Sequence, residues 1–433
     1  MEEPYVKLLS ARVFFLISFL AIAPLAALGN GAVITVEPGE SIQDAVNRAR
    51  PGDIIEVESG YYEESVYVDK PLILRGQKAL GKPTIIEAQS REGAVVLDAN
   101  GCSLEKLVIK NSKGCGICVL SDFNNICNNS IPVAQTGIYL EDCQGNRIAR
   151  NIVFSSWYLG TGIELSQSCN NSLVKNTAFG GWLSTAIRLW DGSNNNTIVN
   201  NFARDDGWCG NGIDLQDSCD NIILHNTAST DSKVLGANGI CIGWASNNNT
   251  IRENTACGSG WKGNGIYIFS SDNNTIAKNN VSSRGDSESD GIFLCSSDNN
   301  TLMGNNVSDN RDYGIDLLSS SDNNTIMNNV VRDNAKGIFI HGYNNTIYLN
   351  DFINNGVSAH SWDLSTRWCS PMPMTYQYND KTIKGYLGNR WSDYQGKDAT
   401  GDGIGDRPYT FDDGEDAYPL MRICDQYSKK FME

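Results

Sequence analysis

Gly265-Ile266-Tyr267-Ile268, followed after a short polar turn by Asn273-Asn274-Thr275-Ile276, is the clearest copy of the unit that decides the fold of this chain. Copies of the unit recur through residues 116–350 with a period of 21 to 27 residues. Each copy holds three short strand-like runs separated by Gly, Asn, Ser and Asp, so it has no room for a helix of normal length. A repeat of this length and composition is typical of a solenoid.

Apolar side chains alternate along the first strand of every unit. The residue after the leading Gly, or after Ala186, is always Ile, and the residue two positions later is Leu, Ile or Val. Because side chains on a strand alternate between its faces, these two positions share one face, and stacked units bury that face in a continuous column. We therefore predict an all-β protein, a parallel β-helix of about ten coils, with the paired Asn side chains stacked in ladders at the turns.

Different patterns flank the repeats, which occupy residues 111–352. In residues 1–29, Lys7 and Arg12 precede an apolar run, a secretory signal pattern, so we expect a mature protein that is secreted or in the cell envelope and has no integral membrane span. Residues 30–110 are expected to form an N-terminal cap and the first coils, because Ser41 begins a short amphipathic helix that would cover the open end of the column. Residues 353–433, rich in Trp and Tyr, are expected to form the C-terminal cap.

Charge and cysteine content restrict the partners. The net charge of −16 and the pI near 4.7 argue against nucleic acid or an anionic membrane surface and suit a cationic ligand such as Ca²⁺. Among the 13 cysteines, Cys369 and Cys424 flank the C-terminal cap and are the pair we expect to bridge. Cys115 and Cys118 have CxxC spacing, but residues three apart on a strand face opposite ways, so we expect neither metal nor redox use there.

Both flanking regions carry motifs that resemble a known family. The motifs are Ser41-Ile-Gln-Asp-Ala-Val, Arg50-Pro-Gly-Asp-Ile-Ile-Glu-Val, Asn389-Arg-Trp-Ser-Asp-Tyr-Gln-Gly and Gly401-Asp-Gly-Ile-Gly-Asp-Arg-Pro-Tyr. They are similar to segments of secreted right-handed parallel β-helix proteins of the carbohydrate-binding and sugar-hydrolase (CASH) group, and above all to the NosD-like family. The resemblance implies a right-handed helix. It also implies a cell-envelope role, for instance as a periplasmic partner of an ABC transporter in copper-enzyme maturation.

One segment of the C-terminal region has the spacing of a calcium loop. Residues 398–406 match the first nine positions of such a loop, with a carbonyl oxygen available at the seventh, but Tyr409 stands where the bidentate Glu belongs. The alternative is an acidic, glycine-rich turn without metal. The expected Ca²⁺ ligands are Asp398, Thr400, Asp402, Ile404 and Asp406.

Charged residues occupy the outward position between the two inward residues in three successive units. Glu164, Arg188 and Asp214 are expected to lie roughly 5 Å from one another along the stack, which puts the two acids about 10 Å apart. That separation is close to the spacing of the carboxylates in inverting glycosidases, and Arg188 would contact an acidic sugar. These three are the candidate catalytic residues. The alternative is a ladder of ion pairs that stabilises neighbouring coils.

Tryptophans recur in the loops beside these strands. Trp182, Trp208 and Trp261 each lie four residues before the start of their unit, so they are expected to form a row. Such a row would offer flat platforms for sugar rings, or it would cover the apolar column. The candidate carbohydrate-binding residues are Trp157, Trp182, Trp190, Trp208, Trp244, Trp261 and Tyr267.

The function that these residues favour is binding of a polysaccharide or glycan along an exposed sheet face. Three alternatives stay open: a polysaccharide hydrolase or lyase, a NosD-like maturation factor for a copper enzyme, and a structural surface protein. Three histidines without ligand spacing argue against direct copper binding.

Overall fold

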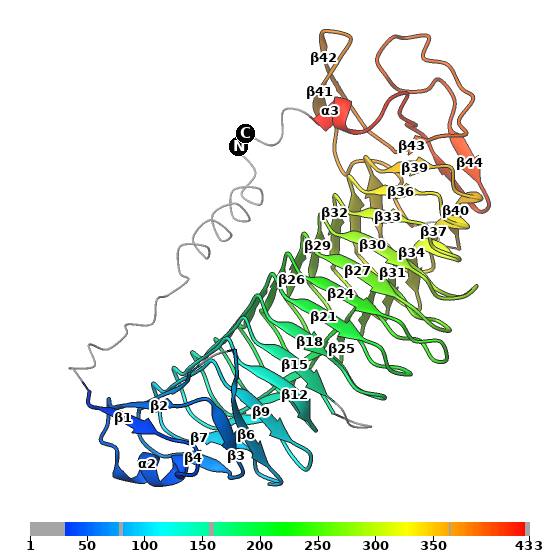
Figure 1. Ribbon diagram of the computed structural model, residues 1–433. Helices are drawn as coiled ribbons and strands as arrows, with labels where there is room; N and C mark the ends of the chain where they lie inside the picture. Colours follow the sequence, from blue (N-terminus) through cyan, green and yellow to red (C-terminus); the bar gives the residue numbers. More distant parts are fainter. Residues whose placement is uncertain (1–30, 78–80, 156–159, 363–364, 429–433) are drawn as a thin grey trace.

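The computed structural model describes residues 31–77, 81–155, 160–362 and 365–428, so the expected signal segment and Trp157 lie outside the described residues. The chain winds into an elongated parallel β-helix whose coils are stacked along one axis (Figure 1). The predicted fold class is confirmed. The stack contains a sheet of 13 strands and two of 14, more than the ten coils expected, because the region before residue 116 adds further complete coils.

Sheet A is formed by the second strand of each unit. Its neighbouring strands are parallel, as in the pairing of Thr250, Ile251 and Arg252 with the next coil. In order, its strands are β1 (Val33–Val36), β2 (Ile54–Val57), β5 (Ile73–Gly76), β8 (Ser103–Glu105), β11 (Asn125–Cys127), β14 (Arg147–Ala149), β17 (Ser172–Val174), β20 (Thr197–Val199), β23 (Ile222–Leu224), β26 (Thr250–Arg252), β29 (Thr275–Ala277), β32 (Thr301–Met303), β35 (Thr325–Met327) and β38 (Thr346–Tyr348).

Sheet B is formed by the Gly-Ile-x-Leu strands, and its outer face carries the candidate site. In order, its strands are β4 (Val66–Val68), β7 (Val95–Leu97), β10 (Ile117–Val119), β13 (Ile138–Glu141), β16 (Ile163–Ser166), β19 (Ile187–Trp190), β22 (Ile213–Gln216), β25 (Ile240–Gly243), β28 (Ile266–Phe269), β31 (Ile292–Cys295), β34 (Tyr313–Leu318), β37 (Lys336–Ile340) and β40 (Val357–Ser361).

Sheet C closes each coil. In order, its strands are β3 (Gly60–Tyr62), β6 (Thr84–Ala88), β9 (Val108–Asn111), β12 (Ser130–Ala134), β15 (Ile152–Ser155), β18 (Thr177–Phe179), β21 (Phe202–Asp205), β24 (Thr227–Thr230), β27 (Thr255–Gly258), β30 (Asn280–Ser283), β33 (Asn306–Ser308), β36 (Val330–Arg332), β39 (Asp351–Ile353) and β43 (Arg390–Trp391).

The core is the column of aliphatic side chains enclosed by the three sheets. Ile266 and Ile268 of β28 are fully buried, as are the equivalent residues of β16, β19, β22 and β31. The leading Gly is required by close packing: a Cβ on Gly265 would lie 2.4 Å from Val281 Cγ1 and 2.8 Å from the carbonyl oxygen of Gly291. The alternation predicted from the sequence is therefore confirmed.

The two members of each Asn pair have different roles. The first, such as Asn273, adopts a left-handed conformation with φ of 59°, which Asn tolerates better than most residues. The second, Asn274, is buried, and its Oδ1 accepts a hydrogen bond from the backbone N–H of Asn249 at 2.8 Å. Only the second Asn belongs to the ladder.

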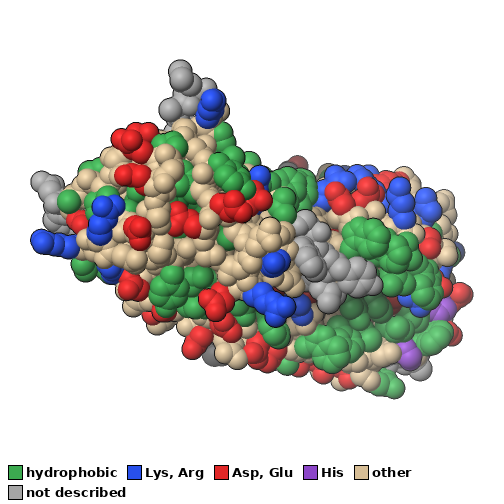
Figure 2. All heavy atoms as spheres, turned by 60° about the horizontal axis from the view of Figure 1, so that its bottom comes forward, with side chains coloured by type: hydrophobic (Ala, Val, Ile, Leu, Met, Phe, Trp, Pro, Cys, Tyr) green, Lys and Arg blue, Asp and Glu red, His purple; other side chains and the backbone are tan. Residues whose placement is uncertain are grey.

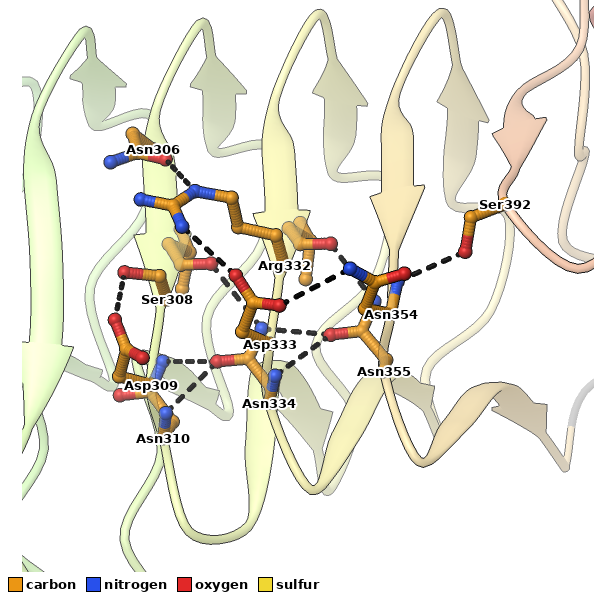
Figure 3. A network of polar contacts seen from close by, with 12 residues as sticks. Asn306, Ser308, Asp309, Asn310, Arg332, Asp333, Asn334, Asn354, Asn355 and Ser392 are labelled. Carbon is orange, nitrogen blue, oxygen red and sulfur yellow. Dashed lines mark hydrogen bonds and ion pairs between the residues drawn. The ribbon is translucent and has the colours of Figure 1, made fainter.

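A second ladder runs along the corner between sheets A and C. The backbone N–H and side-chain amide of Asn254 both donate to Asn279 Oδ1, at 2.9 and 3.0 Å, and Asn279 donates in the same way to Asn305. Asn279 also donates to the carbonyl oxygen of Ile251 at 2.9 Å. Figure 3 shows the same arrangement at a third corner, where the amides of Asn334 and its neighbours point along the stack. These ladders satisfy backbone groups that the turns leave unpaired.

Both ends of the column are covered. Helix α2 (Ile42–Arg48) begins at Ser41, whose hydroxyl accepts a hydrogen bond from the N–H of Asp44 at 3.2 Å, and it buries Ile42 and Val46 against the first coils. At the other end, aromatic rings close the column, as shown by the stacking of Phe352 and Trp391 with centroids 4.4 Å apart. The remaining elements there are hairpins β41 (Met374–Tyr378)/β42 (Lys381–Gly385) and β44 (Tyr409–Phe411)/β45 (Gly414–Asp416), and helix α3 (Asp425–Ser428).

In the part of the chain that the structure describes, no helix is long and apolar enough to cross a bilayer.

Asn279→Ala tests the ladder. The substitution removes the acceptor of two hydrogen bonds from Asn254 and the donor to Ile251, so buried polar groups lose their partners. We expect the free energy of unfolding to fall by about 3 kcal/mol or more. The measurement is urea denaturation followed by circular dichroism. The matched control is Asn280→Ala, because Asn280 is exposed and accepts a single side-chain hydrogen bond, from Asn306. An equal loss of unfolding free energy in both variants would contradict the role of the ladder.

Candidate functional site

The outward residues of sheet B form one continuous row across the coils. The backbone register pairs Glu164 with Arg188, and Arg188 with Asp214, as the sequence predicted. The complete row, in order, is Tyr67, Val96, Cys118, Tyr139, Glu164, Arg188, Asp214, Cys241, Tyr267, Phe293, Asp316, Phe339 and His360.

The charged part of the row is more buried than an exposed ladder of ion pairs would be. Asp214 is 3% exposed, and its Oδ2 lies 4.0 Å from Arg188 Nε and accepts a hydrogen bond from Gln216 at 2.9 Å. Arg188 also donates to Gln216 Oε1 at 3.1 Å. Among the described residues, Arg188 forms an ion pair with Asp214 and not with Glu164. Glu164 is half-buried and lines a groove that extends along the row towards the N-terminal coils.

Three buried polar atoms in this area lack hydrogen-bond partners. They are Arg188 Nε and Trp190 Nε1, which are donors, and Asp214 Oδ1, which is an acceptor. The Cys241 thiol lies near the carboxyl, and burial raises the pKa of Asp214 although the charge of Arg188 opposes that rise. Buried groups of this kind are costly unless something satisfies them, so this area lowers the stability of the coils that hold it.

Two of the predicted tryptophans form a stacked pair beside this area. Trp182 and Trp208 lie in the loops that lead into β19 and β22, with ring centroids 5.1 Å apart and planes 17° apart. The backbone N–H of Trp208 donates to the carbonyl oxygen of Trp182 at 2.6 Å, which keeps the two loops in register. Trp182 is 57% exposed and Trp208 47%, so the rings do not serve to cover the core.

The other candidate aromatic residues lie in three places. Trp261 continues the row of loops, but Leu235 stands between it and Trp208. Trp190 is the last residue of β19, and Arg188 Cζ lies 5.3 Å from its ring centroid, whereas Trp244 follows β25. Tyr267 belongs to the outward row itself. In the space-filling view, hydrophobic side chains gather in a broad patch on one half of the face shown, bordered by acidic and basic groups (Figure 2).

Sequence reasoning missed a second group of acids farther along the same face. Asp316 stands between Phe293 and Phe339 in the outward row, is 8% exposed, and has no partner for its Oδ1. Asp290 is also buried and accepts a hydrogen bond from the backbone N–H of Tyr313 at 2.8 Å. Burial raises the pKa of Asp290 to about 7, and burial together with the charges of Asp290 and Asp312 raises the pKa of Asp316 well above its ordinary value.

A lysine and an aromatic ring border these acids. Lys336 Nζ lies 2.7 Å from Asp312 Oδ1 and 4.4 Å from the ring centroid of Tyr313. Tyr313 in turn stacks on Phe339 with centroids 5.3 Å apart. The signal that could have indicated this group is the replacement of Asn by Asp290 at the position held by Asn238 and Asn264 in preceding coils.

The predicted calcium loop uses its acids as backbone acceptors. Asp398 accepts hydrogen bonds from the N–H groups of Gly401 and Gly403 at 2.7 and 2.8 Å, and Asp406 accepts one from Ala399 at 2.9 Å. Asp402 accepts from the N–H of Ile404 at 2.9 Å, and Thr400 donates to Asp398. Among the described residues, no group of three His, Cys, Asp or Glu side chains is placed to hold a metal ion. Binding of calcium by this loop stays a prediction.

The cysteines correct a further expectation, and two histidines share an aromatic neighbour. His341 and His360 both pack against Trp362, with ring centroids 5.0 and 5.9 Å from it. All 13 cysteines are free in the structure, so the bridge expected between Cys369 and Cys424 is not formed. The Cys424 backbone N–H instead donates to Asp351 at 3.2 Å.

Similarity to known proteins supports the fold. Residues 209–396 match the family described as periplasmic copper-binding protein (NosD), and residues 92–256 match the right-handed β-helix region. The solved Dettilon tailspike protein is similar at a TM-score of 0.53 and 14% identity, over 81% of this chain and 74% of its own. Among curated proteins, no sequence matches this chain significantly.

Two carbohydrate-active enzymes are also similar in structure. The mannuronan C-5 epimerase A-module of Azotobacter vinelandii has 13% identity and a TM-score of 0.47, over 75% of this chain and 91% of its own. A polysaccharide lyase of family PL6 from Pseudopedobacter saltans has 17% identity and a TM-score of 0.47, over 70% of this chain and 85% of its own. At these identities the likeness concerns the fold alone.

Asp290→Asn tests the raised pKa. Between the ordinary pKa of 3.8 and the folded-state value of about 7, the folded protein holds a proton that the unfolded chain releases, so Asp290 destabilises the fold as pH rises through this window. Asn cannot ionise and still accepts the Tyr313 N–H. We expect the variant to be more stable than the wild type by about 2 kcal/mol at pH 8, with the difference shrinking towards pH 4.

Thermal denaturation across pH measures this effect. The exposed Asp286→Asn, in the same loop, is the control and should leave the profile unchanged. A wild type that is the more stable protein at pH 8 would contradict the assignment.

Proposed function

We propose that this chain, a NosD-like right-handed parallel β-helix protein, binds a polysaccharide or glycan along the outer face of sheet B. The observation that carries the proposal is the exposed, stacked pair of Trp182 and Trp208 beside the buried polar atoms of Arg188 and Asp214. Flat aromatic surfaces suit the C–H faces of sugar rings, and buried donors and acceptors suit their hydroxyl groups. We place the protein outside the cytoplasm, in the cell envelope or secreted.

The charge of the face favours particular glycans. Arg188 is the cation in the outward row, but it is already paired with Asp214, and the chain as a whole carries a net charge of −16. A strongly acidic polymer would therefore be repelled by most of the surface. Neutral glycans, or glycans with few carboxylates, fit this distribution better.

Trp208→Ala tests binding. Truncation removes one ring of the stacked pair without opening the core, because the ring is 47% exposed. We expect the affinity for a glycan selected on an array to fall about tenfold or more, which corresponds to about 1.4 kcal/mol. Isothermal titration calorimetry measures the affinity. Tyr343→Ala is the control, because Tyr343 is also an exposed aromatic residue, in the turn after β37, and an equal loss in both variants would remove the assigned site.

A second candidate function is cleavage of the bound glycan. It is favoured by Asp214, because burial shifts the pKa of this carboxyl upward, which is the direction that a general acid needs. If the protein cleaves the glycan that it binds, Asp214→Asn should lower the rate of product release by about a hundredfold or more and leave the affinity nearly intact. Mass spectrometry of the digest measures the products. A wild type that binds and releases no products would leave binding as the function.

A further inference from the structure

A groove of about 490 Å³ opens on the outer face of sheet B over β7, β10, β13 and β16. It lies towards the N-terminal end of the stack and is separate from the tryptophan pair. Its walls include Cys115, Cys118, Tyr139, Glu141 and Glu164. These two cysteines are separated by only two residues in the chain.

Both cysteines line this one groove, which corrects the expectation, drawn from strand alternation, that they face opposite ways. Cys118 is the central residue of β10, but Cys115 precedes the strand, which begins at Ile117. Because the backbone bends between them, the rule for residues three apart on a strand does not apply. The Cys115 thiol donates a hydrogen bond to the carbonyl oxygen of Glu92 at 2.9 Å.

The environment gives the two cysteines different reactivity. The nearby Cys118 thiol lowers the pKa of Cys115, whereas the nearby Cys115 thiol and burial raise the pKa of Cys118. Cys115 is half-buried and Cys118 is 7% exposed. Cys115 is therefore the accessible sulfur that ionises first, and Cys118 is the protected thiol behind it, the arrangement of an attacking and a resolving cysteine.

We propose that Cys115 and Cys118 form a dithiol that exchanges with small disulfides entering this groove. The Cys115 thiolate attacks a disulfide RSSR, so that a mixed disulfide forms and one RS⁻ leaves. The Cys118 sulfur, after losing its proton to solvent, attacks Cys115 and releases the second RS⁻. The protein dithiol is oxidised by two electrons to an internal disulfide, and RSSR is reduced to two RSH once both leaving thiolates are protonated.

The charges of the groove select the kind of disulfide. Glu141 and Glu164 lie close enough to oppose ionisation of Cys115, and Glu92 lines the same groove beside a single basic residue, Arg91. An anionic disulfide such as glutathione disulfide would be repelled, whereas a dicationic disulfide such as cystamine would be attracted. This preference should weaken as salt screens the charges.

The test is a time course with cystamine or glutathione disulfide on the full chain, quenched with iodoacetamide and mapped by mass spectrometry. We expect an internal Cys115–Cys118 disulfide that dithiothreitol reverses. Cystamine should react about tenfold faster than glutathione disulfide at low salt, and the ratio should fall in high salt. Cys118→Ser should stop at a mixed disulfide on Cys115, and Cys115→Ser should abolish the reaction at this site.

Cys295→Ser provides the matched control, because Cys295 is a half-buried thiol on the same sheet whose pKa burial raises. Its loss should leave the time course unchanged. The proposal is overturned if Cys115 reacts no faster than Cys295 in the wild type, or if no bond forms between Cys115 and Cys118. Since both outcomes are read from the wild-type protein, they hold even if a cysteine variant fails to fold.

Discussion

Every coil of this protein must present the same groups at the same place as its neighbours, and the Asn ladders enforce that constraint. Asn279 Oδ1 accepts two hydrogen bonds from one neighbouring coil, while its own N–H groups donate to the other neighbour and to Ile251. A coil displaced along the chain by one residue would leave all of these groups buried and unpaired. Coils can therefore differ in length only in loops that lie outside the ladders, such as the loops before β19 and β22 that carry Trp182 and Trp208.

The same constraint fixes which outward side chains meet. Tyr267 and Phe293 stack with centroids 5.2 Å apart because their backbones pair in adjacent strands. Asp316 is placed between Phe293 and Phe339 by the same register, although neither ring can satisfy its carboxyl. A solenoid tolerates such a local cost, since its stability is distributed over many coils. A protein that served only as a spacer would have no use for buried, unpaired carboxyls, so their presence favours a face that acts on a ligand.

The sequence was sufficient for those features that depend on periodicity. The burial of Ile266 and the order of Glu164, Arg188 and Asp214 follow from alternation and from the repeat. It was insufficient where the backbone departs from a strand. Cys115 was assigned to the wrong face because the bend before β10 leaves no signal in the alternation pattern.

Two further features depend on context that a single sequence does not display. Asn273 and Asn274 look equivalent, yet only the second has its side chain in the ladder. Asp290 was overlooked because it occupies a ladder position, where its carboxyl replaces an amide and becomes buried. Burial of an acid is set by the packing of neighbouring coils, and the chemical identity of the residue alone does not indicate it.

The distance along the face limits the size of the ligand. Trp208 leads into β22 and Asp316 lies in β34, four strands farther along sheet B, which corresponds to roughly 19 Å at the usual spacing between strands. A single sugar cannot contact both places, whereas an extended chain lying along the stack contacts successive coils. Because the row of outward residues is continuous between them, with Tyr267 and Phe293 midway, the geometry suits a polymer better than a small molecule. The regular rise of the coils therefore supports the proposal that the ligand is a polysaccharide.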